Sequence, residues 1–320
     1  MQLYLKNNMC VLYHGDNLDV LPKMPNGKVN LIYCDVLYNT KSKFNDYIDD
    51  LGTPKEAVEW YRPRFVEMHR LLAENGSMYI HCDWHLNSYL RVLLDEIFGY
   101  ECFKNEIIRQ STNAKNNSKN WGKVYDNILF YVKDPENYIW NEAKEPKIES
   151  DLLTQYNKVT SDGGRRYTTI PLHAKGVTKN GETGKDWNSK SHGLVKLPDG
   201  RHWATSHVVM DDLDSNGVIE WSKNNVPRKI LYADEYGDKH IQNIWDLKSI
   251  SGESNISYDT QKPVELLDRI IRASSNEGDL VCDFFMGSGV TALVSKSLNR
   301  RFVGCDINIK SLELTKKHYE

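Results

Sequence analysis

Strand and helix signals alternate at both ends of the chain, and this alternation constrains the fold more than any other feature of the sequence. Residues 29–34 form a short apolar run, residues 55–72 carry apolar side chains at helical spacing, and residues 78–82 form a second apolar run. The runs predict buried strands, and the spacing predicts an amphipathic helix. Strands that alternate with helices pair in parallel, because each helix returns the chain to the same edge of the sheet. We therefore predict an α/β fold.

The alternation is interrupted in the middle of the chain. It fades after Gln110, where a polar stretch begins, and residues 160–250 mix Gly, Lys, Trp and charged residues with weak periodicity. It returns near Tyr258 with two helical patterns and two further apolar runs. The simplest organisation is one α/β domain that encloses an irregular, partly β insertion. We place the first part of the domain at 1–110, the insertion at 111–254 and the second part at 255–320.

The composition is ordinary for a globular protein. Of the 320 residues, 40% are hydrophobic and 27% are charged. The apolar runs are shorter than the roughly 18 residues needed to cross a bilayer, and residues 1–6 lack the apolar core of a signal peptide. We therefore expect a cytoplasmic protein without a membrane partner. The six cysteines are scattered without a Cys-x-x-Cys pair, so we expect no metal site.

The net charge of −3 does not by itself suggest a nucleic-acid-binding protein, but the distribution of charge matters more than the sum. Residues 103–123 contain five Lys or Arg residues and a single Glu. Acidic residues concentrate elsewhere, around 46–50 and 211–214. A local basic face is therefore compatible with an acidic chain.

A glycine-containing loop is the strongest local motif. The run Asp283-Phe284-Phe285-Met286-Gly287-Ser288-Gly289-Val290-Thr291 follows a predicted strand and begins a predicted helix. Its two glycines allow the backbone to approach a ligand, and the helix N-terminus supplies free N–H groups. The next predicted strand ends at Asp306, where an acid can bind ribose hydroxyls or cap the following helix. Loop and acid together favour an adenosine-containing cofactor, without separating NAD from S-adenosylmethionine.

A second motif, Asp35-Val36-Leu37-Tyr38-Asn39-Thr40, closes the strand at 29–34. It resembles the Asp-Pro-Pro-Tyr motif of the S-adenosylmethionine-dependent amino-methyltransferases that modify DNA, which Asn-Thr often follows. The loop at 283–291 resembles the cofactor motif of the same superfamily. The order of the two motifs resembles the β group, including type III modification subunits. The resemblance covers nearly the whole chain and implies a Rossmann-like methyltransferase sheet that is interrupted by a partly β recognition domain.

The resemblance implies a catalytic role for Asp35, Val36, Leu37 and Tyr38. An exocyclic amino nitrogen is a poor nucleophile, because its lone pair is delocalised into the base. A carboxylate that accepts one N–H and a carbonyl that accepts the other favour the tetrahedral nitrogen needed for attack. Asp35 fits the first role and the Val36 carbonyl the second, while Tyr38 would stack on the base after it is flipped out of the duplex.

The motif departs from the family pattern at its centre. Val36 and Leu37 replace the usual pair of prolines, which fix φ and restrict the preceding residue. The loop must then be held by packing instead. The backbone carbonyls, Asp35 and Tyr38 survive the change, so we expect activity and keep an impaired enzyme as an alternative.

The resemblance also assigns residues to S-adenosylmethionine. Asp16 matches the acid that binds the adenine amino group, Lys262 lies near the methionine end, and Phe285 would pack on the adenine. Without the resemblance, Asp16 is equally well explained as a helix N-cap and Lys262 as a solvated lysine at a helix start. The other cofactor-binding residues implied are Asp283, Gly287, Ser288, Gly289, Thr291 and Asp306.

The insertion would be the target-recognition domain, in which side chains read bases while phosphate contacts set the register. A solvated charged face is the alternative for each basic residue, and the tryptophans are more often core than stacking platforms. The candidate DNA-binding residues, inside and outside the insertion, are Asn39, Lys115, Lys119, Lys123, Arg165, Arg166 and Arg228.

Together these features predict a site-specific DNA methyltransferase that acts on adenine N6. Asp35 favours adenine, since relatives that modify cytosine N4 often carry Ser there, but cytosine N4 and an inactive DNA-binding homologue remain alternatives. A nicotinamide dehydrogenase is suggested only by the glycine loop. The expected partner is double-stranded DNA, and a homodimer and a restriction subunit are left open.

Overall fold

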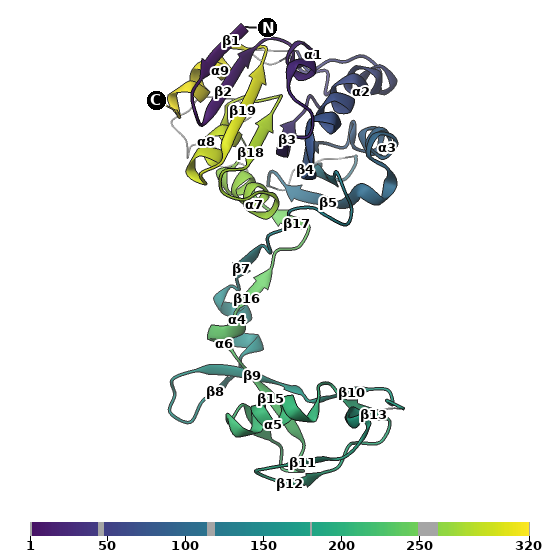
Figure 1. The fold of residues 1–320 in the computed structure, drawn as a ribbon, viewed down its shortest axis with the longest axis vertical. Helices are drawn as coiled ribbons and strands as arrows, with labels where there is room; N and C mark the ends of the chain where they lie inside the picture. Colours follow the sequence, from purple (N-terminus) through teal and green to yellow (C-terminus); the bar gives the residue numbers. More distant parts are fainter. Residues whose placement is uncertain (1, 44–47, 114–118, 180, 249–261, 320) are drawn as a thin grey trace. The chain divides into compact units, whose positions relative to one another are not determined.

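The computed structural model describes residues 2–43, 48–113, 119–179, 181–248 and 262–319. The chain forms two compact units. The sheet unit comprises Met1–Ala143 and Gln242–Glu320, and the inserted unit comprises Lys144–Ile241. Figure 1 shows the strands of the sheet unit drawn from both ends of the chain, in purple to blue and in green to yellow. None of the described helices is long and apolar enough to span a membrane.

The described part of the sheet unit contains a nine-stranded sheet in the order β1-β2-β19-β18-β3-β4-β6-β5-β17. Its inner strands β2, β19, β18, β3 and β4 pair in parallel, whereas β6 is antiparallel to both β4 and β5. Parallel strands are covered on both faces, which is why they carry near-continuous apolar runs. The strands are β1 Gln2–Lys6, β2 Cys10–His14, β3 Val29–Asp35, β4 Leu72–Cys82, β5 Phe103–Gln110, β6 Tyr125–Val132, β17 Ile244–Asp246, β18 Leu280–Asp283 and β19 Arg301–Asp306.

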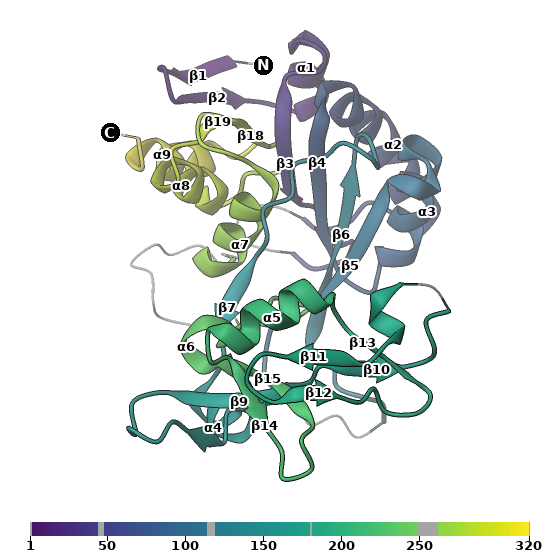
Figure 2. The same ribbon diagram turned by 60° about the horizontal axis from the view of Figure 1, so that its bottom comes forward.

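Helices connect and cover these strands. The longest, α2, begins with a capping box in which Thr53 and Glu56 satisfy each other's backbone N–H groups. It packs beside α3, and α7 packs beside α8 (Figure 2). The helices of this unit are α1 Asn17–Val20, α2 Pro54–Leu71, α3 Asn87–Phe98, α7 Val264–Ser274, α8 Val290–Ser297 and α9 Ile309–Lys317, with short 3-10 turns at Leu21–Lys23 and Tyr100–Cys102.

The strand directions determine where a site can form. Because β3, β4, β18 and β19 are parallel, their carboxyl ends lie at one edge of the sheet. Asp35, Asp283 and Asp306 are the last residues of three of these strands. Acidic residues that are more than 240 positions apart in the sequence are thereby gathered at one edge.

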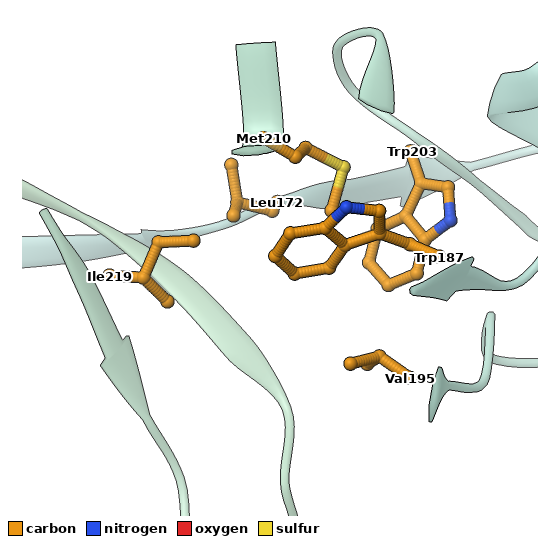
Figure 3. Close-up of a cluster of buried hydrophobic side chains, with 6 residues drawn as sticks. All are labelled: Leu172, Trp187, Val195, Trp203, Met210 and Ile219. Carbon is orange, nitrogen blue, oxygen red and sulfur yellow. The ribbon is translucent and has the colours of Figure 1, made fainter. Parts of the chain in front are cut away.

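The inserted unit has its own small core. A four-stranded sheet in the order β14-β15-β9-β8 lies beside shorter two-stranded pairs. Trp187 and Trp203 are fully buried and pack with four other apolar side chains (Figure 3). Each indole N–H has a partner, Asp211 at 2.9 Å and the Lys185 carbonyl at 2.7 Å. These two tryptophans are therefore core residues.

The remaining bounds of the inserted unit are β7 Lys144–Pro146, α4 Glu149–Gln155, β8 Lys158–Val159, β9 Arg166–Pro171, β10 His173–Lys175, a 3-10 turn Glu182–Gly184, β11 Trp187–Ser189, β12 Gly193–Val195, β13 Arg201–Trp203, α5 His207–Ser215, β14 Ile219–Trp221, β15 Pro227–Tyr232, α6 Ala233–Tyr236 and β16 Asp238–His240.

The structure moves the expected boundaries of the insertion from 111–254 to 144–241. At the first boundary, β6 returns to the sheet and separates β4 from β5. At the second, β17 adds to the outer edge of β5. Both strands belong to the sheet because their backbone groups complete its hydrogen-bonding ladders. The apolar run at 128–132 indicates a strand, but it does not reveal that the strand pairs between β4 and β5.

Candidate active site

A pocket at the carboxyl edge of the sheet is lined by residues from both sequence motifs. It contains Asp35 from the end of β3 and much of the loop between β18 and α8. The two motifs meet because β3 and β18 are adjacent strands. The lining residues are Tyr33, Asp35, Lys262, Leu267, Asp283, Phe285, Met286, Gly287, Ser288, Val290 and Thr291.

Both carboxylate oxygens of Asp35 are engaged. The Tyr38 hydroxyl donates to Oδ1 at 2.8 Å, and the Lys262 ammonium forms an ion pair with Oδ2. The Asp35 side chain is 23% exposed, so the carboxylate can still be reached from solvent. Burial and the nearby Asp35 charge raise the pKa of Tyr38, which keeps its hydroxyl a donor. Tyr38 therefore points toward the carboxylate in this structure, while its stacking on a base stays a prediction.

Hydrogen bonds hold the loop that lacks the family's prolines. The Val36 side chain is buried, and its N–H donates to the His81 carbonyl of β4 at 3.2 Å. A proline at this position could not make that bond. The Tyr61 hydroxyl of α2 donates to the Leu37 carbonyl at 2.8 Å. The loop is thus tied to both a strand and a helix.

Asn39 is a structural residue of this loop. It is buried with φ of 60°, a left-handed conformation that Asn tolerates. Its side chain accepts from Leu51 N–H at 2.8 Å and donates to the Gly52 carbonyl at 3.0 Å. Asp49 accepts the N–H groups of Asn39 and Thr40 at 2.8 and 3.0 Å. These polar groups of Asn39 are used within the chain, and its contact with DNA stays a prediction.

A buried polar network lies next to Asp35. The Tyr33 hydroxyl lies 2.7 Å from His81 Nδ1, and His81 Nε2 lies 3.1 Å from Asp126. Arg109 donates to both oxygens of Asp126 at 2.9 and 2.7 Å, and both side chains are nearly inaccessible. Although burial opposes ionisation, His81 and Arg109 hold the pKa of Asp126 well below its usual value. Arg109 therefore does not contribute to an exposed basic face.

Asp283, the last residue of β18, holds the glycine loop through hydrogen bonds. This buried carboxyl accepts the Phe285 N–H at 3.0 Å and the Thr291 hydroxyl at 2.6 Å. Burial is the main cause that raises the pKa of Asp283 to about 7. The ring centroid of Phe285 lies 6.1 Å from that of Trp60 and 6.2 Å from that of Tyr61. Phe285 forms an aromatic wall of the pocket.

Asp306 fixes the other side of the loop. Its carboxylate accepts the N–H groups of Gly287 and Asn308, both at 2.8 Å. Gly289 caps α8 in a left-handed conformation with φ of 78°, and a methyl group there would lie 2.1 Å from Thr315 Oγ1. No residue with a side chain fits this position, which explains the second glycine of the motif.

Asp16 is a helix N-cap and also the partner of a buried arginine, and its local motif indicated only the first of these roles. It caps α1 by accepting the Leu18 N–H at 2.9 Å, and both its oxygens accept from Arg64 at 3.0 and 2.9 Å. The Arg64 guanidinium also lies 3.4 Å above the Trp60 ring. Asp16 lies outside the set of pocket-lining residues, so contact with a cofactor adenine stays a prediction. Arg64 was missed because a lone Arg within a helical pattern resembles a solvated residue.

The predicted DNA-binding cations differ in their availability. Arg165 is paired with Asp234 and Glu235, and Arg228 donates to Thr169, so both are engaged within the inserted unit. Arg166 and Lys119 are exposed. Lys123 lies over the ring of Trp84. Lys115 lies outside the described residues.

Comparison with known proteins identifies the family. A family model described as DNA methylase, for N6 and N4 methyltransferases, matches residues 29–317. The chain belongs to this DNA methylase family. Among its relatives, the type II methyltransferase M.EcaI of Enterobacter cloacae is 35% identical over 91% of this chain. The DNA adenine methyltransferase YhdJ of Escherichia coli K12 is 25% identical over 96% of this chain and 82% of its own length.

The chain spans only part of the length of several relatives. It covers 65% of the length of M.EcaI and 53% of the StyLTI Mod subunit, a type III enzyme of Salmonella typhimurium to which it is 26% identical over 95% of this chain.

Solved structures share the fold of this chain. The M1.HpyAVI–SAM complex superposes with a TM-score of 0.54 at 20% identity over 98% of this chain and all of that one. The cytosine-N4-specific PvuII DNA methyltransferase gives 0.56 at 11% identity, over 98% and 87%.

Proposed function

We propose that this DNA methylase transfers a methyl group from S-adenosylmethionine to N6 of an adenine that has been flipped out of double-stranded DNA. The observation that carries the proposal is one pocket lined by both Asp35 and the loop from Asp283 to Thr291. The first supplies a carboxylate for an amino group, and the second supplies a close backbone approach for a cofactor. M.EcaI and YhdJ are named as methyltransferases, which supports the same reaction.

Residues in and next to the pocket offer groups that suit an adenosine and a methionine moiety. Phe285 offers an aromatic wall for a purine, and Lys262 offers a cation for a carboxylate. Asp306 lies at the end of β19, where an acid can bind ribose hydroxyls. Gly287 and Gly289 leave room for the backbone to approach. When bound, the cofactor supplies a methyl group on a positively charged sulfur.

Asp35 would hold the target amino group. Its carboxylate accepts one N–H, while the Val36 carbonyl accepts the other, so that the nitrogen lone pair turns toward the methyl group. Both present partners of Asp35 must yield for this to happen. Lys262 can leave Asp35 and pair with the carboxylate of the methionine moiety instead, which frees Oδ2 of Asp35. Tyr38 can rotate from Oδ1 to stack on the base.

Several partners follow from this function. Mod subunits among the relatives support double-stranded DNA as substrate and a restriction subunit as partner. The inserted unit, residues 144–241, would recognise the target sequence. A homodimer is a further proposal that rests on the resemblance alone.

The test is transfer of labelled methyl groups from S-adenosylmethionine to unmethylated genomic DNA, followed by nucleoside analysis. We expect label in N6-methyldeoxyadenosine, and a loss of at least about a hundredfold in Asp35→Ala, because the side-chain acceptor is removed. Glu136→Ala, at an exposed acidic residue of the sheet unit that follows β6, is the matched control and should transfer at the normal rate. Label in N4-methyldeoxycytidine would establish the alternative target, and no label despite cofactor binding would refute the enzyme.

A further inference from the structure

Two tryptophans of the sheet unit are exposed near the catalytic edge. The Trp84 side chain is 46% accessible, and Trp121 is 94% accessible. Large aromatic side chains usually bury most of their surface, so their exposure beside a site points to a binding surface. Neither residue lines the pocket described above.

Strand register places Trp84 close to Asp35. Asp35 pairs with His81 across β3 and β4, and Trp84 follows His81 by three residues. Three extended residues span at most about 10 Å. Trp121 belongs to the segment that leads into β6, whose first residues lie opposite the end of β4. Both indoles are thus at the edge of the sheet that carries the catalytic carboxylate.

Positive and aromatic groups surround Trp84. The Lys123 ammonium lies 3.3 Å from the centroid of the indole ring. The His85 ring lies 3.7 Å from it, and Asp83 holds that ring by contacts of 2.9 Å to Nδ1. Exposed rings combined with cations are the surface that single-stranded nucleic acid binds, since bases stack on the rings and phosphates pair with the cations.

We propose that Trp84, Trp121 and Lys123 form a platform that binds the DNA base that loses its partner when the target base is flipped out. The inference rests on the proposed function, because flipping breaks the target base pair and leaves the partner base unpaired. A base gains more from an indole face than an exposed ammonium does, so the arriving base displaces Lys123 from Trp84. The ammonium of Lys123, which follows Trp121 by two residues, then pairs with the phosphate next to that base.

The first experiment measures binding of the full chain to a fluorescent single-stranded oligodeoxynucleotide of mixed sequence and to its duplex. Trp84→Ala and Trp121→Ala should each bind the single strand at least about fivefold more weakly, and Trp84→Phe should retain most of the affinity. The control is Trp140→Ala. Trp140 is 53% exposed, but it lies at the opposite edge of the sheet, because the N–H of the preceding Ile139 donates to the Asn75 carbonyl there. The Trp140→Ala variant should therefore bind the single strand as tightly as the unaltered chain does.

A second readout locates the contact. An oligonucleotide that contains 5-iododeoxyuridine should photo-cross-link to the peptide of Trp84 or Trp121, and not to that of Trp140. The proposal is overturned if both tryptophan variants bind as the control does. It is also overturned if only Lys123→Ala weakens binding, since the surface would then recognise phosphate alone.

Methyl transfer separates this inference from the proposed function. If the unaltered chain transfers methyl groups and Trp84→Ala changes neither KM for DNA nor single-strand affinity, only the platform is refuted. If the unaltered chain transfers none, yet the tryptophan variants lose single-strand binding, the enzyme is refuted and the platform stands.

Discussion

The ion pair between Arg109 and Asp126 offers a quantitative test of the structure. Their exposed fractions are 2% and 5%, and the guanidinium donates two hydrogen bonds to the carboxylate. Asp126→Asn leaves a buried guanidinium without its counter-charge, a change that typically lowers the free energy of unfolding by about 3–5 kcal/mol. Asn retains one acceptor oxygen, so we expect a loss near the lower end, about 3 kcal/mol.

The assay is urea denaturation of the intact chain, with hydrogen exchange of β4 and β6 peptides to isolate the sheet unit. Asp268→Asn is the matched control. It breaks the exposed helical pair with Arg272, whose side chain is 61% accessible, and should lower the free energy of unfolding by no more than about 0.5 kcal/mol. A double variant, Arg109→Met with Asp126→Leu, should recover much of the loss, since no charge is then left unpaired.

The pH dependence of this pair has a definite sign. The pKa of Asp126 is lowered in the folded chain, so the pair stabilises the fold fully above about pH 4 and loses its effect as the pH falls toward the folded pKa. The reasoning is refuted if Asp126→Asn lowers the free energy of unfolding by less than about 1 kcal/mol at neutral pH. It is also refuted if the variant and the unaltered chain respond identically to acid.

Three further substitutions, with one glycine control, test the residues around the site. Val36→Pro should lower the free energy of unfolding by about 1 kcal/mol in urea denaturation, because the N–H that bonds to the His81 carbonyl is lost, and unchanged stability would refute that bond. Gly289→Ala should abolish S-adenosylmethionine binding in calorimetry, since its methyl group would lie 2.1 Å from a side chain of α9. Gly278→Ala has a similar φ of 80° with open space around it, and should keep the affinity. Asp283, with a pKa raised to about 7, makes the folded chain less stable as the pH rises from about 4 through 7, and Asp283→Asn should flatten that slope in pH-dependent thermal unfolding.

Much of the sheet and the pocket could be predicted from local sequence. Apolar runs mark buried strands whatever surrounds them, and two closely spaced glycines mark a loop that must adopt unusual backbone angles. Gly289 shows this directly, since its φ is 78°. Parallel pairing then places Asp35 and Asp283 at one edge without any knowledge of their contacts, because right-handed crossovers leave few arrangements.

The limits of the insertion depended on the tertiary fold. Residues 126–132 are buried in β6 between two other strands, but the position of this strand in the sheet follows from ladder hydrogen bonds rather than from its side chains. Antiparallel pairing needs no helical crossover, so the β–α alternation that identified the other strands is missing at this point.

The partners of charged and polar side chains were decided only by the folded structure. Arg64 reaches Asp16 across 48 residues, and Lys262 reaches Asp35 across 227. Asn39 belongs to the motif at 35–40, from which a DNA contact was predicted. In the folded chain its side chain bonds to the backbone of Leu51 and Gly52 and closes a loop. Local periodicity determines which residues are buried and which strands form, because it reflects the geometry of one element. The pairs Arg64–Asp16 and Lys262–Asp35 join separate elements, so their identity depends on strand order, register and burial, which arise only when the elements pack together.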